Sequence, residues 1–178
     1  MSVNAFGRLT WFVAMFVAQV VRADSPPSAP SLEQIYSNNG RFSVVFDPVN
    51  NHVSVYRNGT RRPQKLWSMR ADVPTLCVSD DGRYLVIYYR NANLLALDHA
   101  HDEIMLSFYD RGRLLSVVRL PQLIGEADLV RTDSHFMWAY SYGFDGAHNF
   151  AVETADHRVH VFDATTGLPV IRRGTRNH

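Results

Sequence analysis

Short runs of β-branched and aromatic residues, separated by turn-forming residues, restrict the fold of this sequence more than any other feature. Gly, Asn, Asp and Pro bound the runs, a pattern typical of β-strands joined by tight turns. Helical periodicity is confined to segments 31–36 and 120–125, each long enough for a turn or two. We therefore expect an all-β chain of antiparallel strands, with runs at 42–46, 52–56, 84–89, 104–109, 114–118, 136–142, 150–153 and 159–162.

An imperfect internal repeat groups these strands into units. Asn39-Gly40-Arg41-Phe42 is similar to Asp81-Gly82-Arg83-Tyr84, 42 residues further on. The separation from Phe42 to Gly59 equals that from Phe150 to Gly167, and the middle unit carries extra residues in 90–102. Self-similarity with a period of about 40 residues is typical of repeated supersecondary units. We expect an antiparallel meander of about three blade-like, four-stranded units.

The turn sequences carry a resemblance to a known family. Ser79-Asp80-Asp81-Gly82-Arg83-Tyr84 opens a strand, and Phe108-Tyr109-Asp110-Arg111-Gly112 and Phe162–Gly167 close strands with a glycine turn. This order resembles the blades of β-propeller repeats of the YVTN and WD40-like kinds, although the Gly-His and Trp-Asp signatures of WD40 blades are absent. The resemblance implies a scaffold that presents loops, and it specifies no chemistry.

The number of units leaves the arrangement of the sheets open. Closed propellers have about 4–8 blades, whereas about three units fit into this sequence. The alternatives are a propeller-like stack of meanders, a sandwich or open barrel, and a propeller fragment completed by a partner.

The two ends of the sequence differ from the middle. Residues 1–23 have a basic residue, an apolar core from Leu9 to Val21, and small residues before a cut after Ala23, the layout of a secretory signal. We expect a signal peptide at 1–23, a flexible leader at 24–38, one β-repeat domain at 39–173 and a disordered tail at 174–178. The protein would then be exported, periplasmic or secreted, with no membrane span after cleavage.

Charge and cysteine content exclude several classes of function. The formal net charge is +1, so no overall field attracts nucleic acid, and we expect no nucleic-acid partner. The single cysteine, Cys77, excludes an intrachain disulfide and any zinc site that needs two thiolates. Its apolar surroundings favour a buried, inert thiol over a nucleophile.

One histidine pair has the spacing of metal ligands. His99 and His101 lie in the extra segment of the middle unit, and alternate residues of an extended chain project to the same side. Together with Asp102 they would offer two imidazoles and a carboxylate to a transition metal. The alternative is a solvated loop tip rich in polar residues, and we expect no other cofactor.

A second candidate site is aromatic. Trp138, Tyr140 and Tyr142 alternate along one expected strand, so their rings would share one face. An exposed face would bind a carbohydrate, a peptide or a protein, whereas a buried face would serve as packing. Arg90, at the start of the extra segment, is a further candidate for binding a partner.

No catalytic motif is present, so the sequence favours a non-enzymatic protein. There is no Gly-x-Ser-x-Gly elbow and no phosphate-binding glycine loop. We predict an exported binding protein that presents loops and strand faces to a macromolecular, most simply protein, partner, such as a periplasmic inhibitor or immunity-type module. The alternatives are a metal-binding protein or metal-dependent enzyme using His99 and His101, and a carbohydrate-binding module using the Trp138 face.

Overall fold

The computed structural model describes residues 33–59, 61–71, 75–146 and 148–170. The predicted signal peptide, most of the predicted leader and the predicted tail lie outside these residues. Among the described residues, none of the helices combines the length and apolar character needed to cross a membrane.

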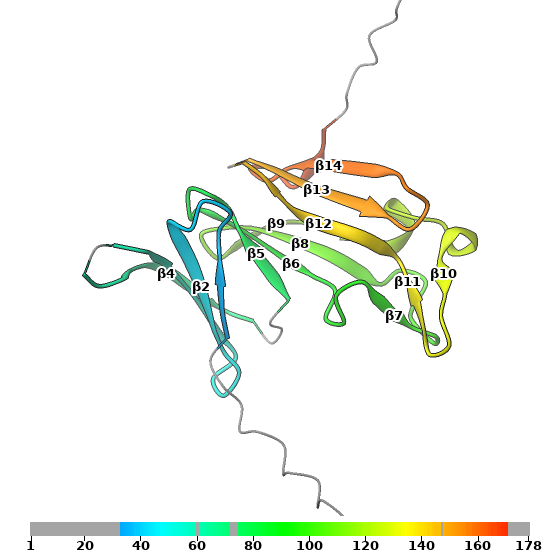
Figure 1. Cartoon of the computed structure of the whole chain (residues 1–178), viewed down its shortest axis with the longest axis horizontal. Coiled ribbons are helices and arrows are strands. Elements are labelled where there is room, and N and C mark those ends of the chain that lie inside the picture. The colour runs from blue at the N-terminus through cyan, green and yellow to red at the C-terminus, as the bar shows by residue number, and fades with distance from the viewer. Residues whose placement is uncertain (1–32, 60, 72–74, 147, 171–178) are drawn as a thin grey trace, which may run out of the picture.

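The chain is all-β, as predicted, and three of its four sheets are four-stranded antiparallel meanders (Figure 1). The first sheet contains β1 (Glu33–Tyr36), β2 (Phe42–Asp47), β3 (His52–Arg57) and β4 (Gln64–Arg70). The second contains β5 (Leu76–Val78), β6 (Tyr84–Tyr88), β8 (Ile104–Asp110) and β9 (Arg113–Arg119). The third contains β12 (Ala139–Asp145), β13 (Asn149–Thr154), β14 (Val159–Asp163) and β15 (Leu168–Pro169).

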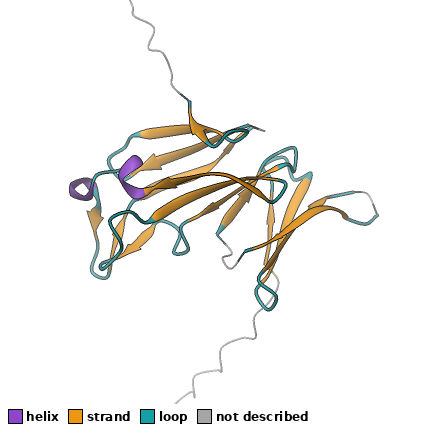
Figure 2. Cartoon of the chain, turned by 180° about the vertical axis from the view of Figure 1, so that it is seen from behind, coloured by secondary structure: helices purple, strands orange, loops and turns teal. Residues whose placement is uncertain are grey.

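A smaller fourth sheet comes from the two long connections. It has the order β10–β11–β7, formed by β10 (Val130–Arg131), β11 (His135–Met137) and β7 (Leu94–Ala96). Two 3-10 turns, Leu120–Gln122 and Glu126–Asp128, are the only helical elements among the described residues (Figure 2). Segment 31–36, expected to make a helical turn or two, instead contains strand β1, which lies within the predicted leader.

The repeated turn has the same hydrogen bonds at its two expected copies. The hydroxyl of Ser79 donates to Asp81 and accepts from the amide of Tyr84, and the amide of Gly82 donates to the carbonyl of Ser79. The copy that begins at Ser37 makes the equivalent bonds. Because the hydroxyl and the carboxyl or amide oxygen satisfy the backbone of the turn, each copy specifies a tight strand connection.

A similar turn connects β13 to β14, at a different place in its sheet, because the first two copies connect the first and second strands of theirs. Thr154 donates to Asp156, and the amide of His157 donates to the carbonyl of Thr154. His157 has a φ of +63°, close to the +71° of Gly82, so this histidine has the backbone conformation that glycine takes in the repeated turn. The place equivalent to the repeated turn in the third sheet is the connection between β12 and β13.

Two apolar cores join the three sheets. Val44, Val53 and Val55 of the first sheet pack against Leu76 and Leu85 of the second. The opposite face of the second sheet packs against the third in a larger core that contains Tyr84, Val86, Phe108, Phe150 and Phe162. The second sheet is therefore covered on both faces, and the three sheets fan out side by side (Figure 1).

Neighbouring sheets pack in the same way each time: a glycine in the turn between the third and fourth strands of one sheet lies against the fourth strand of the sheet before it. We call this contact the packing step. A Cβ atom on Gly112, in the β8–β9 turn, would lie 3.2 Å from Met69 of the first sheet. A Cβ atom on Gly167, in the equivalent β14–β15 turn, would lie 3.0 Å from Phe108 of the second sheet and would overlap Ser116. Strand pairing shows which residues of the two sheets are equivalent. Asn149 pairs with Asp163 as Tyr84 pairs with Asp110, so Asn149 is the counterpart of Tyr84 in the third sheet. The alignment predicted from the sequence began the third unit at Phe150, one residue later. It therefore assigned to one face of the third sheet the residues that lie on the other face.

Candidate functional site

The aromatic face predicted from alternation is not formed. Trp138 is 0% exposed and donates its indole N–H to the carbonyl of Ala92 at 2.8 Å, so it anchors the larger core. Tyr140 is 44% exposed and stacks on His157, with ring centroids 4.9 Å apart. Tyr142 is half-buried against Tyr88, at 4.2 Å between ring centroids.

A register shift explains this correction. The pairing of β12 with β13 is irregular between Ala139 and Ser141, so the strict alternation of side chains is interrupted there. Trp138 and Tyr142 therefore point into the molecule while Tyr140 points out. A carbohydrate platform of three rings on one face does not exist in this arrangement.

The histidine pair converges on a residue that the sequence did not single out. The Nε2 atom of His99 lies 3.2 Å from a carboxylate oxygen of Glu126, and the Nδ1 atom of His101 lies 3.3 Å from the other. The Nδ1 of His99 also lies 2.8 Å from the carbonyl oxygen of Ala96, and its side chain is only 6% exposed. The carboxylate comes from the 3-10 turn after β9, far along the chain from both histidines.

The predicted metal-ligand set is not assembled. Asp102 forms an ion pair with Arg119 at 3.0 Å and does not join His99 and His101. Within the described ranges, no group of three or more His, Cys, Asp or Glu side chains is arranged to hold a metal ion. His99, His101 and Glu126 therefore form a hydrogen-bonded cluster.

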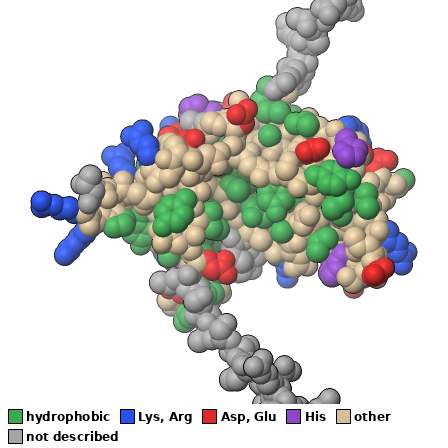
Figure 3. All heavy atoms as spheres, viewed as in Figure 1, with side chains coloured by type: hydrophobic (Ala, Val, Ile, Leu, Met, Phe, Trp, Pro, Cys, Tyr) green, Lys and Arg blue, Asp and Glu red, His purple; other side chains and the backbone are tan. Residues whose placement is uncertain are grey.

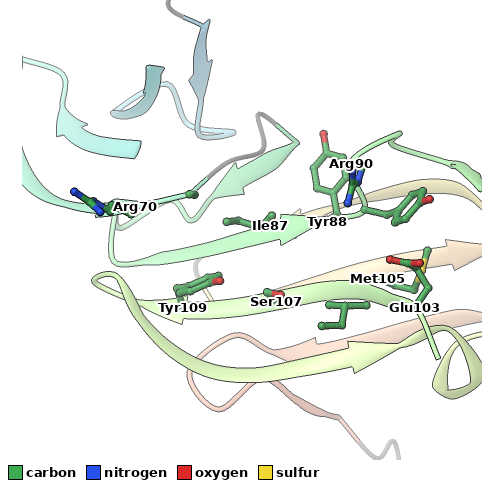
Figure 4. A pocket seen from close by; sticks show the side chains of 11 residues that line it. Arg70, Ile87, Tyr88, Arg90, Glu103, Met105, Ser107 and Tyr109 are labelled. Carbon is green, nitrogen blue, oxygen red and sulfur yellow. The ribbon is translucent and has the colours of Figure 1, made fainter. Parts of the chain in front are cut away.

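A cleft beside the second sheet carries several polar side chains. Its volume is about 360 Å³, and Figure 4 shows the residues that line it. Its walls come from the end of β4, from β6 and β8, and from both ends of the connection that follows β6: Arg70, Ala71, Ile87, Tyr88, Tyr89, Arg90, Glu103, Ile104, Met105, Ser107 and Tyr109.

Strand pairing explains why Arg90 and Glu103 meet at this cleft. Tyr88 pairs with Leu106 across β6 and β8, and the amide of Tyr89 donates to the carbonyl of Met105. Residues just beyond these pairs must therefore lie opposite one another, although the intervening connection is long. Arg90 was a candidate binding residue from the sequence, and this pairing places it in the cleft together with Glu103.

The charged groups lie at one end of the cleft and the hydroxyls lie along its floor. Figure 4 shows Arg90 and Glu103 at one end, and Ser107 and Tyr109 in a row on β8. Arg70 lies at the opposite rim, with its guanidinium turned away from the other labelled side chains (Figure 4). Among the described residues, neither Arg90 nor Glu103 forms an ion pair, so both charges are available to a ligand.

Two ionisable groups near the cleft are held neutral by their surroundings. Burial raises the pKa of Tyr88 well above its usual range, and the neighbouring Tyr142 raises it further. Burial also raises the pKa of the Cys77 thiol to about 11. Cys77 is therefore a protonated, inert thiol at neutral pH, as predicted, and it provides no nucleophile.

Comparison with solved structures finds all-antiparallel proteins that are named as enzymes. A protein described as a 6-phosphogluconolactonase from Bacteroides fragilis is 15% identical over 78% of this chain, with a TM-score of 0.35. A periplasmic gluconolactonase from Pseudomonas aeruginosa is 18% identical over 77% of this chain, with a TM-score of 0.39. The chain spans 36% and 37% of the lengths of these two structures. No family model matches the sequence, and no curated protein matches it.

The prediction of a non-enzymatic binding protein is contradicted by this comparison, because both similar structures carry the names of lactone-hydrolysing enzymes. The prediction relied on the absence of sequence motifs. A cleft such as the one at Arg90 and Glu103 has no motif, because strand pairing assembles it from separate segments. The sequence feature that pointed to the cleft was the long connection between β6 and β8, because Arg90 and Glu103 lie near its two ends.

Proposed function

We propose that the protein is a hydrolase that acts on a small, hydroxylated ester or lactone in the cleft beside β6 and β8. The observation that carries the proposal is a cleft of about 360 Å³ with a carboxylate and a guanidinium at one end and two hydroxyls along its floor. A cavity of this size suits a molecule of one sugar ring, and small-molecule sites combine an apolar wall with a few polar groups in this way.

The roles of the side chains follow from their chemistry. The Glu103 carboxylate would take a proton from water as the water oxygen attacks the substrate carbonyl carbon. The Arg90 guanidinium would stabilise the negative charge that develops on the carbonyl oxygen. When the tetrahedral intermediate collapses, the C–O bond of the ester breaks, and the alkoxide leaving group takes up a proton. The products are a carboxylic acid and an alcohol.

The remaining polar groups would select the substrate. The hydroxyls of Ser107 and Tyr109 can donate to or accept from substrate hydroxyls along the floor of the cleft. The apolar side chains of Ile87 and Ile104 would contact the carbon skeleton of the substrate. A site built in this way favours a hydroxylated ring over a purely apolar ester.

The test is a pH-stat assay with δ-gluconolactone and its 6-phosphate, with the spontaneous rate subtracted. We choose these compounds because both similar structures are named for lactone hydrolysis. Loss of a general base typically lowers the rate by about 10²–10⁴-fold, so Glu103→Gln should lower kcat by that amount. Arg90→Gln should lower kcat/KM, because the developing charge is no longer stabilised.

The matched control is Glu126→Gln, which neutralises a carboxylate outside the cleft. It should leave the rate within about twofold of the wild-type rate. Activity that survives Glu103→Gln, or that falls with Glu126→Gln, would reject the cleft as the active site. Preference for the phosphorylated lactone would indicate that Arg90 also binds an anionic group.

We infer further that the three sheets are blade repeats of the YVTN and WD40-like kind, and that the protein is exported. The two copies of the serine turn, at Ser37 and Ser79, and the recurring packing step of Gly112 and Gly167 support the first inference. The second rests on the secretory layout of residues 1–23. N-terminal sequencing of the protein from its native compartment would test export, with Asp24 as the expected first residue.

A further inference from the structure

Among the described residues, no other sheet covers one face of the first sheet or one face of the third. In the first sheet, Val44, Val53 and Val55 pack towards the second sheet, so alternation turns the intervening residues to the other side. We call this side the first outer face; its centre consists of Ser43, Val45, Ser54, Tyr56 and Ser68. Ser43 and Ser54 are buried among their neighbours, whereas Val45, Tyr56 and Ser68 are half-buried.

The third sheet has a comparable surface on the opposite side of the fan. Phe150, Val152 and Phe162 pack towards the second sheet, which leaves the alternate residues outward. We call this the second outer face; its centre consists of Ser141, Gly143, Ala151, Glu153, Val159 and Val161. A shallow concavity of about 280 Å³ lies over it, and Val159 is exposed.

These two faces occupy equivalent places in the repeated packing step. Ala151 and Val161 take the positions that Val86 and Phe108 take in the second sheet, where the third sheet covers them. Ser43 takes the position of Leu85, which the first sheet covers. The first outer face of one chain could therefore cover the second outer face of another chain, in the way that the third sheet covers the second sheet within one chain.

The charges on the two faces are complementary. Two basic side chains, Lys65 and Arg70, and one carboxylate, Asp47, lie on the same side of the first sheet as Ser54 and Ser68. Three carboxylates, Asp145, Glu153 and Asp163, lie on the same side of the third sheet as Ala151. Figure 3 shows that Lys and Arg side chains also gather at the end of the molecule formed by the β3–β4 hairpin. Complementary charge favours contact between unlike faces and opposes contact between like faces.

We propose that two copies of this chain associate head to tail, with the second outer face of each copy packed on the first outer face of the other. Contacts between unlike faces close into a ring when the rotation permits it. Two copies of three sheets give six, which lies within the range of about 4–8 blades found in closed propellers, whereas three copies would exceed it. The proposal is independent of the hydrolase activity.

The test is sedimentation velocity at about 1–100 µM, with the wild-type chain and two variants that each block one face. Ala151→Arg places a long charged side chain in the second outer face, and Ser68→Arg does so in the first. We expect the wild type to sediment with the mass of two chains and each variant with the mass of one. Leu114→Arg, at an exposed position of the second sheet outside both faces, should remain dimeric.

An equimolar mixture of the two variants distinguishes head-to-tail association from any other. One intact contact remains in the mixed pair, so a species with the mass of two chains should reappear. Far-UV circular dichroism establishes that each variant is folded before the comparison. A monomeric wild type over the whole range overturns the proposal, and so does a dimer that survives Ala151→Arg or Ser68→Arg, or that does not return on mixing.

Discussion

Gly82→Ala is the substitution that tests the packing between the first and second sheets most sharply. Gly82 has a φ of +71°, and a Cβ atom there would lie within 3.0 Å of three ring carbons of Phe42. Gly40 occupies the same place in the equivalent turn, with a φ of +68°, and a Cβ atom there would meet nothing within 4 Å. The two substitutions therefore share a conformational cost and differ in the contact between sheets.

The magnitudes separate the two effects. An L-residue in the left-handed region costs about 1–2 kcal/mol, and both variants incur this. Overpacking of a filled core costs about 1–3 kcal/mol more, and only Gly82→Ala incurs it, because the Phe42 ring is 5% exposed and has little room to withdraw. Gly40→Ala should lower the free energy of unfolding by about 1–2 kcal/mol, and Gly82→Ala by about 2–5 kcal/mol.

Urea denaturation followed by circular dichroism measures both values. The double variant Gly82→Ala, Phe42→Leu should recover part of the loss, because a smaller, more flexible side chain makes room for the methyl group. Equal losses for Gly40→Ala and Gly82→Ala, or a strictly additive double variant, would show that the first sheet does not rest on the second as described.

Three further predictions concern single groups. Trp138→Phe should lower the free energy of unfolding by about 2–4 kcal/mol, because it removes buried volume and the bond to Ala92, whereas Tyr140→Phe should change it by less than about 0.5 kcal/mol; thermal melts compare them. Cys77 should react with a disulfide reagent at pH 8 about 100-fold more slowly in the folded than in the urea-unfolded protein, because its thiol has a pKa of about 11. Burial opposes ionisation of Asp156, but hydrogen bonds from Thr154 and Arg158 hold its pKa at about 2, below the ordinary 3.8. The ionised form therefore stabilises the fold above about pH 4, and this contribution is lost as the pH falls towards 2. In an acid titration, the free energy of unfolding of Asp156→Asn should depend less on pH in this range than that of the wild type.

The sequence predicted those features that depend on neighbouring residues. The strands 42–47 and 84–88 were recognised because runs of Val, Ile, Phe and Tyr form strands whatever lies around them. The Ser79–Arg83 turn was recognisable because its hydrogen bonds join residues a few positions apart. The apolar neighbours of Cys77 in the sequence likewise indicated its apolar surroundings, although its side chain is half-buried rather than fully buried.

Features that depend on tertiary contact were missed. The irregular pairing near Ala139 turned Tyr140 outward, and no local pattern signals such a shift. Glu126 meets His99 only because the connection after β9 folds back over the fourth sheet. Arg90 and Glu103 are brought together by the pairing of β6 with β8, which a single sequence does not reveal.

The position of the ligand in the cleft is the most direct test of the functional proposal. The chain contains five methionines, and selective ¹³C labelling of their methyl groups gives a simple spectrum. Met105 is buried directly beside the cleft, so its methyl signal responds to a ligand through the residues around it. Met137 lies in β11, which pairs with β7 in the fourth sheet. Met105→Leu and Met137→Leu assign the two signals.

The measurement is a titration of the labelled protein with D-gluconate, the unreactive product of δ-gluconolactone hydrolysis. We predict that the Met105 signal shifts saturably, that the Met137 signal does not move, and that Arg90→Gln weakens the shift. An unchanged Met105 signal at saturating D-gluconate, or a shift confined to Met137, would contradict the assignment of the cleft as the substrate site.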